Sequence, residues 1–136
     1  MRKMLLLGAL LASLPACQVP ERAYLPPPLP DKVTPRPYAE LLSRARAQAT
    51  LATNAFYVNN FTDVEESARG LEQTAQYLGK AEDVPAKHKD TLATLSTDLG
   101  KLAKSLSEAA AVKDVKKTTD IMGKLQVKVR EMRLSD

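Results

Sequence analysis

The feature of this chain that most constrains its fold is the spacing of leucine in residues 92–109. Apolar residues recur there at alternating intervals of three and four residues. This spacing puts the side chains on one stripe of an α-helix, because a β-strand would repeat at every second residue. The stripe consists of Leu92, Leu95, Leu99, Leu102, Leu106 and Ala109. We therefore expect a helix here, and we expect Pro85 to open it, since proline is tolerated at the first helical position.

Three other segments show the same periodicity. Helices are expected over 37–58, 62–78 and 114–132. Their stripes consist of Tyr38, Leu41, Leu42, Ala45, Ala49, Ala52 and Phe56; of Phe61, Val64, Ala68, Leu71, Ala75 and Leu78; and of Val115, Thr118, Met122, Leu125, Val129 and Met132. The second helix is predicted to start with a capping box of Thr62 and Glu65. Asp114 has the position and the chemistry of an N-cap for the last helix.

Four amphipathic helices joined by short turns can bury their stripes only against one another. We therefore expect an all-α fold, an up-down-up-down four-helix bundle over 38–134. In this topology the contacts at one end should join Phe56, Phe61, Val112 and Val115. The opposite end should collect Tyr38, Leu78, Leu92, Met132 and Leu134. An oligomeric coiled coil with longer helices is the alternative architecture.

A different pattern occupies the start of the sequence. A basic pair, Arg2 and Lys3, precedes an apolar run over 4–14 that leads into Leu14-Pro15-Ala16-Cys17. An apolar run of about eleven residues is typical of a signal peptide, and a transmembrane helix needs roughly 20. The pattern predicts export.

The four residues that end in Cys17 resemble the bacterial lipobox. The resemblance implies that 1–16 is a lipoprotein-type signal peptide and that Cys17 becomes a lipidated N-terminus held in a membrane. Gln18 in the next position favours the periplasmic face of the outer membrane. An ordinary secretory signal cut near Ala16 is one alternative, which would leave a soluble periplasmic or secreted protein, and an uncleaved anchor is another. Cys17 is the only cysteine, so an internal disulfide is excluded.

The segment after the cysteine is rich in proline. Residues 17–37 hold seven of the nine prolines. Proline has no backbone N–H and restricts the residue before it, so neither a helix nor a sheet should form there. We predict a tether that holds the helical domain up to about 60 Å from the lipid surface, as a semi-rigid polyproline stalk or as a disordered spacer.

We expect no catalytic, cofactor-binding or metal-binding residues. Catalysis needs a nucleophile with a base, paired carboxylates in a pocket, or a metal cluster. His88 is the only histidine, lies between two lysines and is expected to be a solvated surface residue. Asp63, Glu65 and Glu66 suit the first turn of a helix, where the helix dipole favours acids. The chain is therefore predicted not to be an enzyme and to carry no cofactor.

The expected architecture resembles the cytochrome b562 and cytochrome c-prime group of exported four-helix bundles. In that group the last helix carries an axial histidine or a Cys-x-x-Cys-His haem attachment. Here residues 122–130 contain neither cysteine nor histidine, and Met122 and Met132 lie on the core stripe, where we expect them to pack. The resemblance implies a bundle that lacks haem ligands.

Charge is distributed unevenly between the helices. Residues 62–84 contain six acids and two bases, whereas 112–134 contain seven bases and three acids. The second and fourth helices of such a bundle lie diagonally, so opposite sides should carry opposite charge. We predict an interaction face of Lys116, Lys117, Lys124 and Lys128 for an anionic protein or lipid headgroups. Nucleic acid is not expected as a partner, because an exported protein has little access to it.

These observations predict a non-enzymatic, lipid-anchored helical module of the periplasm and cell envelope that acts by protein interaction or display. The alternative is a carrier of a small ligand or haem in the interior of the bundle. The alanine-rich stripes of the first two helices are compatible with both functions, since alanine either leaves a pocket or allows helices to approach closely.

Overall fold

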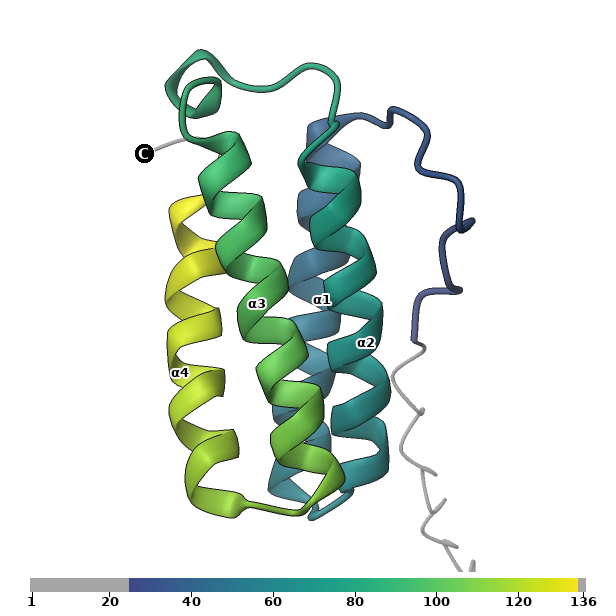
Figure 1. Cartoon of the computed structure of the whole chain (residues 1–136), viewed down its shortest axis with the longest axis vertical. Coiled ribbons are helices and arrows are strands. Elements are labelled where there is room, and N and C mark those ends of the chain that lie inside the picture. The colour runs from purple at the N-terminus through teal and green to yellow at the C-terminus, as the bar shows by residue number, and fades with distance from the viewer. Residues whose placement is uncertain (1–24, 135–136) are drawn as a thin grey trace, which may run out of the picture.

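The computed structural model describes residues 25–134, and Cys17 with its preceding segment lies outside this range. The described chain forms α1 (Tyr38–Tyr57), α2 (Phe61–Leu78), a 3₁₀ turn η1 (Ala86–His88), α3 (Leu92–Ala111) and α4 (Val115–Glu131). The helices run alternately in opposite directions, with neighbouring pairs α1·α2, α2·α3, α3·α4 and α1·α4 (Figure 1). The expected all-α four-helix bundle is confirmed.

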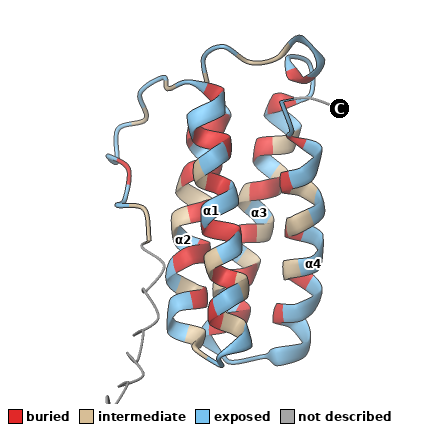
Figure 2. Ribbon diagram, turned by 180° about the vertical axis from the view of Figure 1, so that it is seen from behind, coloured by how far each residue is buried: buried red, intermediate tan, exposed pale blue. Residues whose placement is uncertain are grey.

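The core is the stripe side of each helix. Figure 2 shows the buried positions facing the inside of the bundle and the exposed ones facing out. The largest fully buried side chains include Tyr38, Leu41, Leu42, Leu71, Leu78, Leu99, Leu106, Leu125 and Met132. One buried polar pair is satisfied internally, because the Thr74 hydroxyl donates to the Gln48 side-chain oxygen at 2.8 Å. Because most of the fully buried side chains are apolar, their burial provides the main stabilisation.

The stripe of α4 differs from the prediction at two places. Ile121 is buried, while Met122 is only half-buried and Val115 is 55% exposed. The buried positions Thr118, Ile121, Leu125 and Val129 follow the helical period from the N-cap onwards. Val115 is the first residue of the helix, and its side chain is largely exposed at the end of the bundle.

The helix starts confirm one prediction and correct another. Asp114 caps α4, because its carboxylate accepts the amide of Lys117 at 2.9 Å. Thr62 does not cap α2, which begins at Phe61. Its N-cap is Asn60, whose side-chain oxygen accepts the amide of Asp63 at 3.2 Å. Asparagine is a preferred N-cap residue, so the helix starts earlier than predicted, directly after Asn60.

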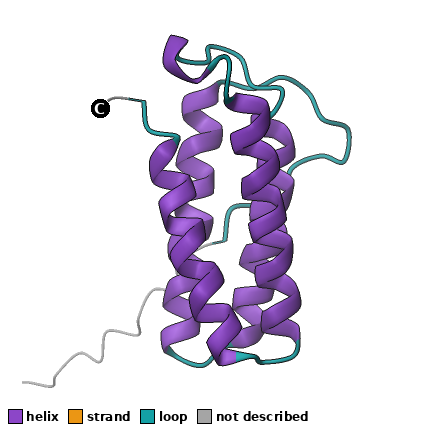
Figure 3. Ribbon diagram, turned by 60° about the vertical axis from the view of Figure 1, so that its left-hand side comes forward, coloured by secondary structure: helices purple, strands orange, loops and turns teal. Residues whose placement is uncertain are grey.

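The two ends of the bundle pack differently from the prediction. Phe56 and Phe61 meet edge to face with their ring centroids 5.9 Å apart, but Val112 is 75% exposed and does not join them. At the other end the expected residues are buried except Leu134, which is 49% exposed. Figure 3 shows that the α1–α2 and α3–α4 turns lie at the same end of the bundle.

Pro85 does not open the third helix. It precedes η1, and α3 begins at Leu92. This extra turn folds over the end of the bundle, so His88 is 6% exposed, contrary to its prediction as a solvated residue. The His88 ring Nε2 lies 2.7 Å from the carbonyl oxygen of Arg133, and the ring lies 5.9 Å from that of Tyr38.

Residues 25–37, here called the strap, pack along α1 and α2 (Figure 1). Leu29 is buried, and its backbone N–H and carbonyl group bond to the Gln73 side-chain amide at 2.8 and 2.6 Å. The Tyr77 hydroxyl lies 2.5 Å from the Pro30 carbonyl oxygen, and Arg44 donates to that of Pro27. These residues therefore pack on the bundle and do not form part of an extended tether, as we expected of the whole segment 17–37. The rest of that segment, residues 17–24, lies outside the described residues.

Candidate functional site

An open groove lies between α2 and α3. Its volume is about 450 Å³, and it is open along one side. Its lining residues are Glu72, Ala75, Gln76, Gly79, Lys80, Ala93, Ser96, Thr97, Gly100, Lys101 and Lys104. We call this surface the α2/α3 groove.

Small residues make the floor of the α2/α3 groove. Gly100 lies in the middle of α3, where glycine is less favourable than alanine by about 1 kcal/mol. Packing does not require this glycine, because a Cβ atom there would meet the nearest atom, the Ala75 Cβ, at an ordinary 3.6 Å. Gly79 is more restricted, since its Cβ would lie 3.2 Å from the Ser96 hydroxyl. At Gly100 the chain thus keeps an open floor at a cost in helix stability.

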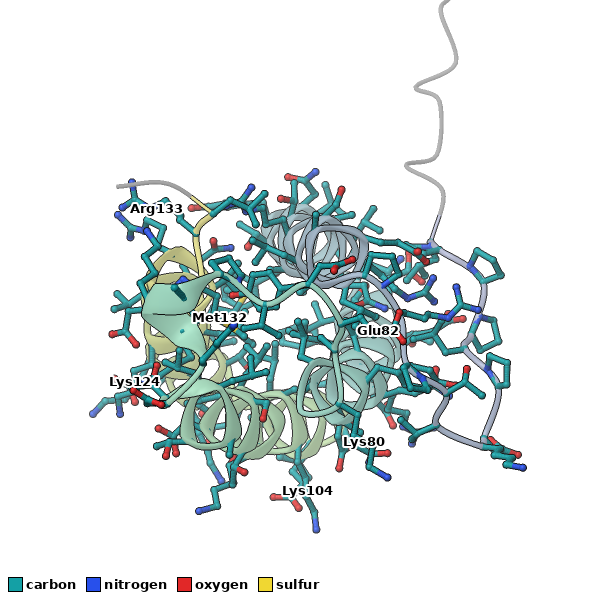
Figure 4. All side chains as sticks on the ribbon, turned by 90° about the horizontal axis from the view of Figure 1, so that it is seen from above. Lys80, Glu82, Lys104, Lys124, Met132 and Arg133 are labelled. Carbon is teal, nitrogen blue, oxygen red and sulfur yellow. The ribbon has the colours of Figure 1, made fainter. Side chains whose placement is uncertain are left out.

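The walls of the α2/α3 groove are cationic. Lys80, Lys101 and Lys104 are exposed, and within the described residues none of them forms an ion pair. Glu72 is the one carboxylate among the lining residues. In Figure 4, Lys80 and Lys104 extend from the same side of the bundle, and Lys124 extends from another. Unpaired ammonium groups beside a concave surface produce a positive local potential that attracts anionic groups.

The predicted interaction face on α4 is partly neutralised. Lys124 donates to Asp120 at 2.7 Å, and Lys128 contacts Glu131 at 2.8 Å and Asp98 of α3 at 3.6 Å. The hydrogen bond to Glu131 is the main cause that raises the pKa of Lys128, which keeps its ammonium group charged but engaged. The other two members, Lys116 and Lys117, lie in the first turn of α4 and form no ion pair with any described residue. The four lysines therefore do not act as one free surface.

Sequence reasoning missed the lysines of the α2/α3 groove because they come from two helices. Lys80 follows α2, and the other two lie three residues apart on α3. The available signal was local: Gly100 lies inside the third predicted helix, directly before Lys101 and four residues before Lys104. Only the pairing of α2 with α3 brings these positions to one surface.

Other classes of site received no support in the described part of the chain. Between residues 25 and 134, no group of three or more His, Cys, Asp or Glu side chains is placed to hold a metal ion. Within the same range, no helix combines the length and the apolar character needed to cross a bilayer. Cys17, the predicted lipidation site, is not among the described residues.

Comparisons of this chain with models of known protein families, with curated proteins and with solved structures found no match.

Proposed function

We propose that this protein is a non-enzymatic interaction module, held at a membrane through a lipid on Cys17, that binds an acidic helical segment of a partner protein in the α2/α3 groove. The observation that carries the proposal is the combination, in one groove, of a glycine floor and unpaired lysine walls. The periplasmic side of the outer membrane is the proposed location, on the basis of the lipobox resemblance and Gln18.

A helix is the occupant that fits the shape of this groove. Two antiparallel helices with small residues between them present a long shallow channel into which a third helix can place its apolar ridge. Gly79 and Gly100 lower the floor and allow the backbone of an incoming helix to approach. Bulky side chains in place of these two glycines would have prevented such packing.

Charge selects the kind of helix. Three lysines against one glutamate give the lining a positive balance, so acidic residues on the flanks of the partner helix gain favourable contacts. Pairs of this kind at an exposed rim contribute mainly to the rate of association and to orientation, while contact with the floor determines the lifetime of the complex. The lysine walls thus recognise the partner helix, and contact with Gly100 keeps it bound.

The test is site-specific photocrosslinking in the cells that produce the protein. A photoreactive residue replaces Thr97, which is exposed on the α2/α3 groove, and, in a second strain, Gly123, which has open space around it on α4. We expect a discrete protein adduct from position 97 and none of the same mass from position 123. Mass spectrometry of the adduct should identify an acidic helical segment.

Matched substitutions then separate specific binding from chance contact. The double variant Lys101→Glu/Lys104→Glu should lose the adduct, and Lys113→Glu/Lys116→Glu, with the same change in net charge elsewhere, should keep it. Gly100→Leu should lose the adduct because it fills the floor, whereas Gly123→Leu should keep it. Equal adducts in all four variants would contradict the proposal.

The anchor is tested on the same material. The mass of the N-terminal peptide of the mature protein should correspond to acylated Cys17. An unmodified thiol would contradict the proposed lipid anchor. Binding in the α2/α3 groove would still be tested separately by the crosslinks from position 97. The alternative of a ligand carried in the interior stays a prediction, which the absorption spectrum of the purified protein tests.

A further inference from the structure

One end of the bundle exposes a group of large apolar side chains. Tyr57 is 78% exposed, Val58 72%, Val112 75% and Val115 55%. They come from the α1–α2 and α3–α4 turns, which lie together at the end opposite η1 (Figure 3). We call these four residues the apolar tip.

The backbone of both turns fixes this exposure. In each turn a valine at the helix C-cap, Val58 or Val112, precedes a residue with positive φ and then the N-cap of the next helix. Both N-cap amides bond back to a carbonyl five residues earlier, Asn60 to Ala55 at 2.9 Å and Asp114 to Ala109 at 3.0 Å. This is the hydrogen bond of a Schellman motif. Two turns of the same construction therefore hold two valines away from the core.

Cations surround one half of the apolar tip. Lys113, Lys116 and Lys117 flank Val112 and Val115, and none forms an ion pair with a described residue. The Asp114 carboxylate among them is engaged as the helix cap. Apolar side chains beside free lysines are the combination that binds the interface of an anionic bilayer.

The strap directs the start of the chain toward the same end. It runs parallel to α2, since Leu29 bonds to Gln73 and Arg36 bonds to Glu82 further along both segments. Gln73 lies twelve residues after Phe61, which is about 18 Å along the helix axis from the apolar tip. Cys17 precedes Leu29 by twelve residues, which span at most about 40 Å. A lipid on Cys17 can therefore lie at the level of the apolar tip or beyond it.

We propose that the apolar tip is the surface by which the domain contacts an anionic membrane. Tyr57, Val58, Val112 and Val115 enter the interface, and the three lysines face lipid phosphates. This inference rests on the proposed lipid anchor, because four side chains are too few to hold a protein to a bilayer. Anchoring raises the local concentration of the membrane surface, so even a weak contact is occupied.

A second copy of the chain fits this surface less well than a membrane does. A stable protein–protein interface buries at least about 1,200 Å² of total surface. Four side chains on two turns do not supply such an area.

Contact with a membrane would also set the orientation of the domain. The helix axes would stand perpendicular to the bilayer, and the α2/α3 groove would face sideways toward other envelope proteins.

The test is the quenching of a single tryptophan by brominated lipids. The chain contains no tryptophan, so Tyr57→Trp at the apolar tip and Leu134→Trp at the opposite end each introduce one fluorophore. The lipidated protein, purified from membranes, is placed in vesicles of phosphatidylglycerol and brominated phosphatidylcholine. We expect the emission of the Tyr57→Trp variant to shift to the blue and to be quenched, and that of Leu134→Trp to change little.

Charge variants and the anchor complete the test. Lys116→Glu/Lys117→Glu should reduce the quenching in the Tyr57→Trp background, and Lys101→Glu/Lys104→Glu should not. If the N-terminal peptide shows a free thiol, the proposed anchor fails, and Cys17 is then coupled to a maleimide lipid so that the apolar tip is measured independently. Equal quenching at both ends, no quenching at either, or dimerisation that buries the tryptophan would overturn the inference.

Discussion

The hydroxyl group of Tyr38, the first residue of α1, donates a hydrogen bond to the carbonyl oxygen of Met132 just after α4, at 2.6 Å. Tyr38 is fully buried. The bond joins the first helix to the last at the end where η1 covers the bundle. It joins the loosest of the four neighbouring pairs, together with the hydrogen bond from the Gln126 side chain to the Thr53 hydroxyl at 3.3 Å.

Replacing this tyrosine should therefore weaken the fold. Tyr38→Phe removes the donor and leaves the Met132 carbonyl unpaired in a buried place, which should lower the free energy of unfolding by about 1–2 kcal/mol. Urea denaturation followed by circular dichroism measures the change. Tyr57→Phe, at an exposed site, is the control and should remain within about 0.5 kcal/mol of the parent. Equal stabilities of the two variants would contradict the role of the bond.

Alkaline pH should act on the same group. Burial raises the pKa of Tyr38 from 10.0 to about 12, and the charge of Arg46 lowers it by less. Between these two values the unfolded chain loses the proton while the folded chain keeps it, so stability falls as the pH rises. The total loss is on the order of 2 kcal/mol. Urea midpoints measured from pH 9 to 12 should fall more steeply for the parent than for Tyr38→Phe.

His88 is expected to contribute to stability although it lies between lysines. His88→Ala removes the ring that packs against Tyr38 and the group that bonds the Arg133 carbonyl oxygen, so it should destabilise the protein by about 1–3 kcal/mol. The adjacent exposed residue gives the control, Lys89→Ala, which should have little effect. Thermal unfolding of both variants tests this prediction. An unchanged unfolding temperature of His88→Ala would show that the contacts of His88 do not stabilise the packing of η1 on the bundle.

Release of the strap should be visible by proteolysis. Gln73→Ala removes both hydrogen bonds to Leu29, so residues 25–37 should open more often. Limited trypsin digestion should then cut after Lys32 faster than in the parent, while the bundle remains intact. Gln76→Ala, on the exposed side of α2, should digest at the parental rate.

Two of the helix glycines, Gly100 and Gly123, should respond alike in stability. Gly100→Ala and Gly123→Ala each replace a glycine inside a helix where a Cβ atom has room. Each should raise the free energy of unfolding by about 0.5–1 kcal/mol, as measured by urea denaturation. Loss of stability in Gly100→Ala alone would mean that packing of the α3 backbone requires glycine at this position. Gly100 would then not be evidence for an open groove floor.

The helices were predictable because their cause is local and repeated. The leucine period over 92–109 places Leu92, Leu99 and Leu106 in the core, and Asp114 caps its helix as expected. Val115 and Ile121 show the limit of this reasoning. A period defines a face of the helix, but the packing of the neighbouring helices decides which residues on or beside that face become buried.

The strap, His88 and the α2/α3 groove depend on contacts between distant positions. Polyproline segments have no side-chain period, so the pairing of Leu29 with Gln73 leaves no pattern in either segment. His88 is buried by the fold of η1 over Tyr38, which lies fifty residues earlier in the chain. Lys80 joins Lys101 and Lys104 only because α2 and α3 are adjacent. The architecture was therefore predictable from the sequence, whereas the strap, the burial of His88 and the α2/α3 groove became visible only in the folded structure.

The strap also determines how far the domain can travel from a point of attachment near residue 17. While the strap is packed on the bundle, only residues 18–24 separate Cys17 from the packed part of the chain. Peeling away all thirteen residues of 25–37 in a polyproline conformation would add about 40 Å of reach, with the four helices left as they are. In the proposed lipid-anchored form, release of the strap would thus change the height of the domain above the membrane without unfolding it.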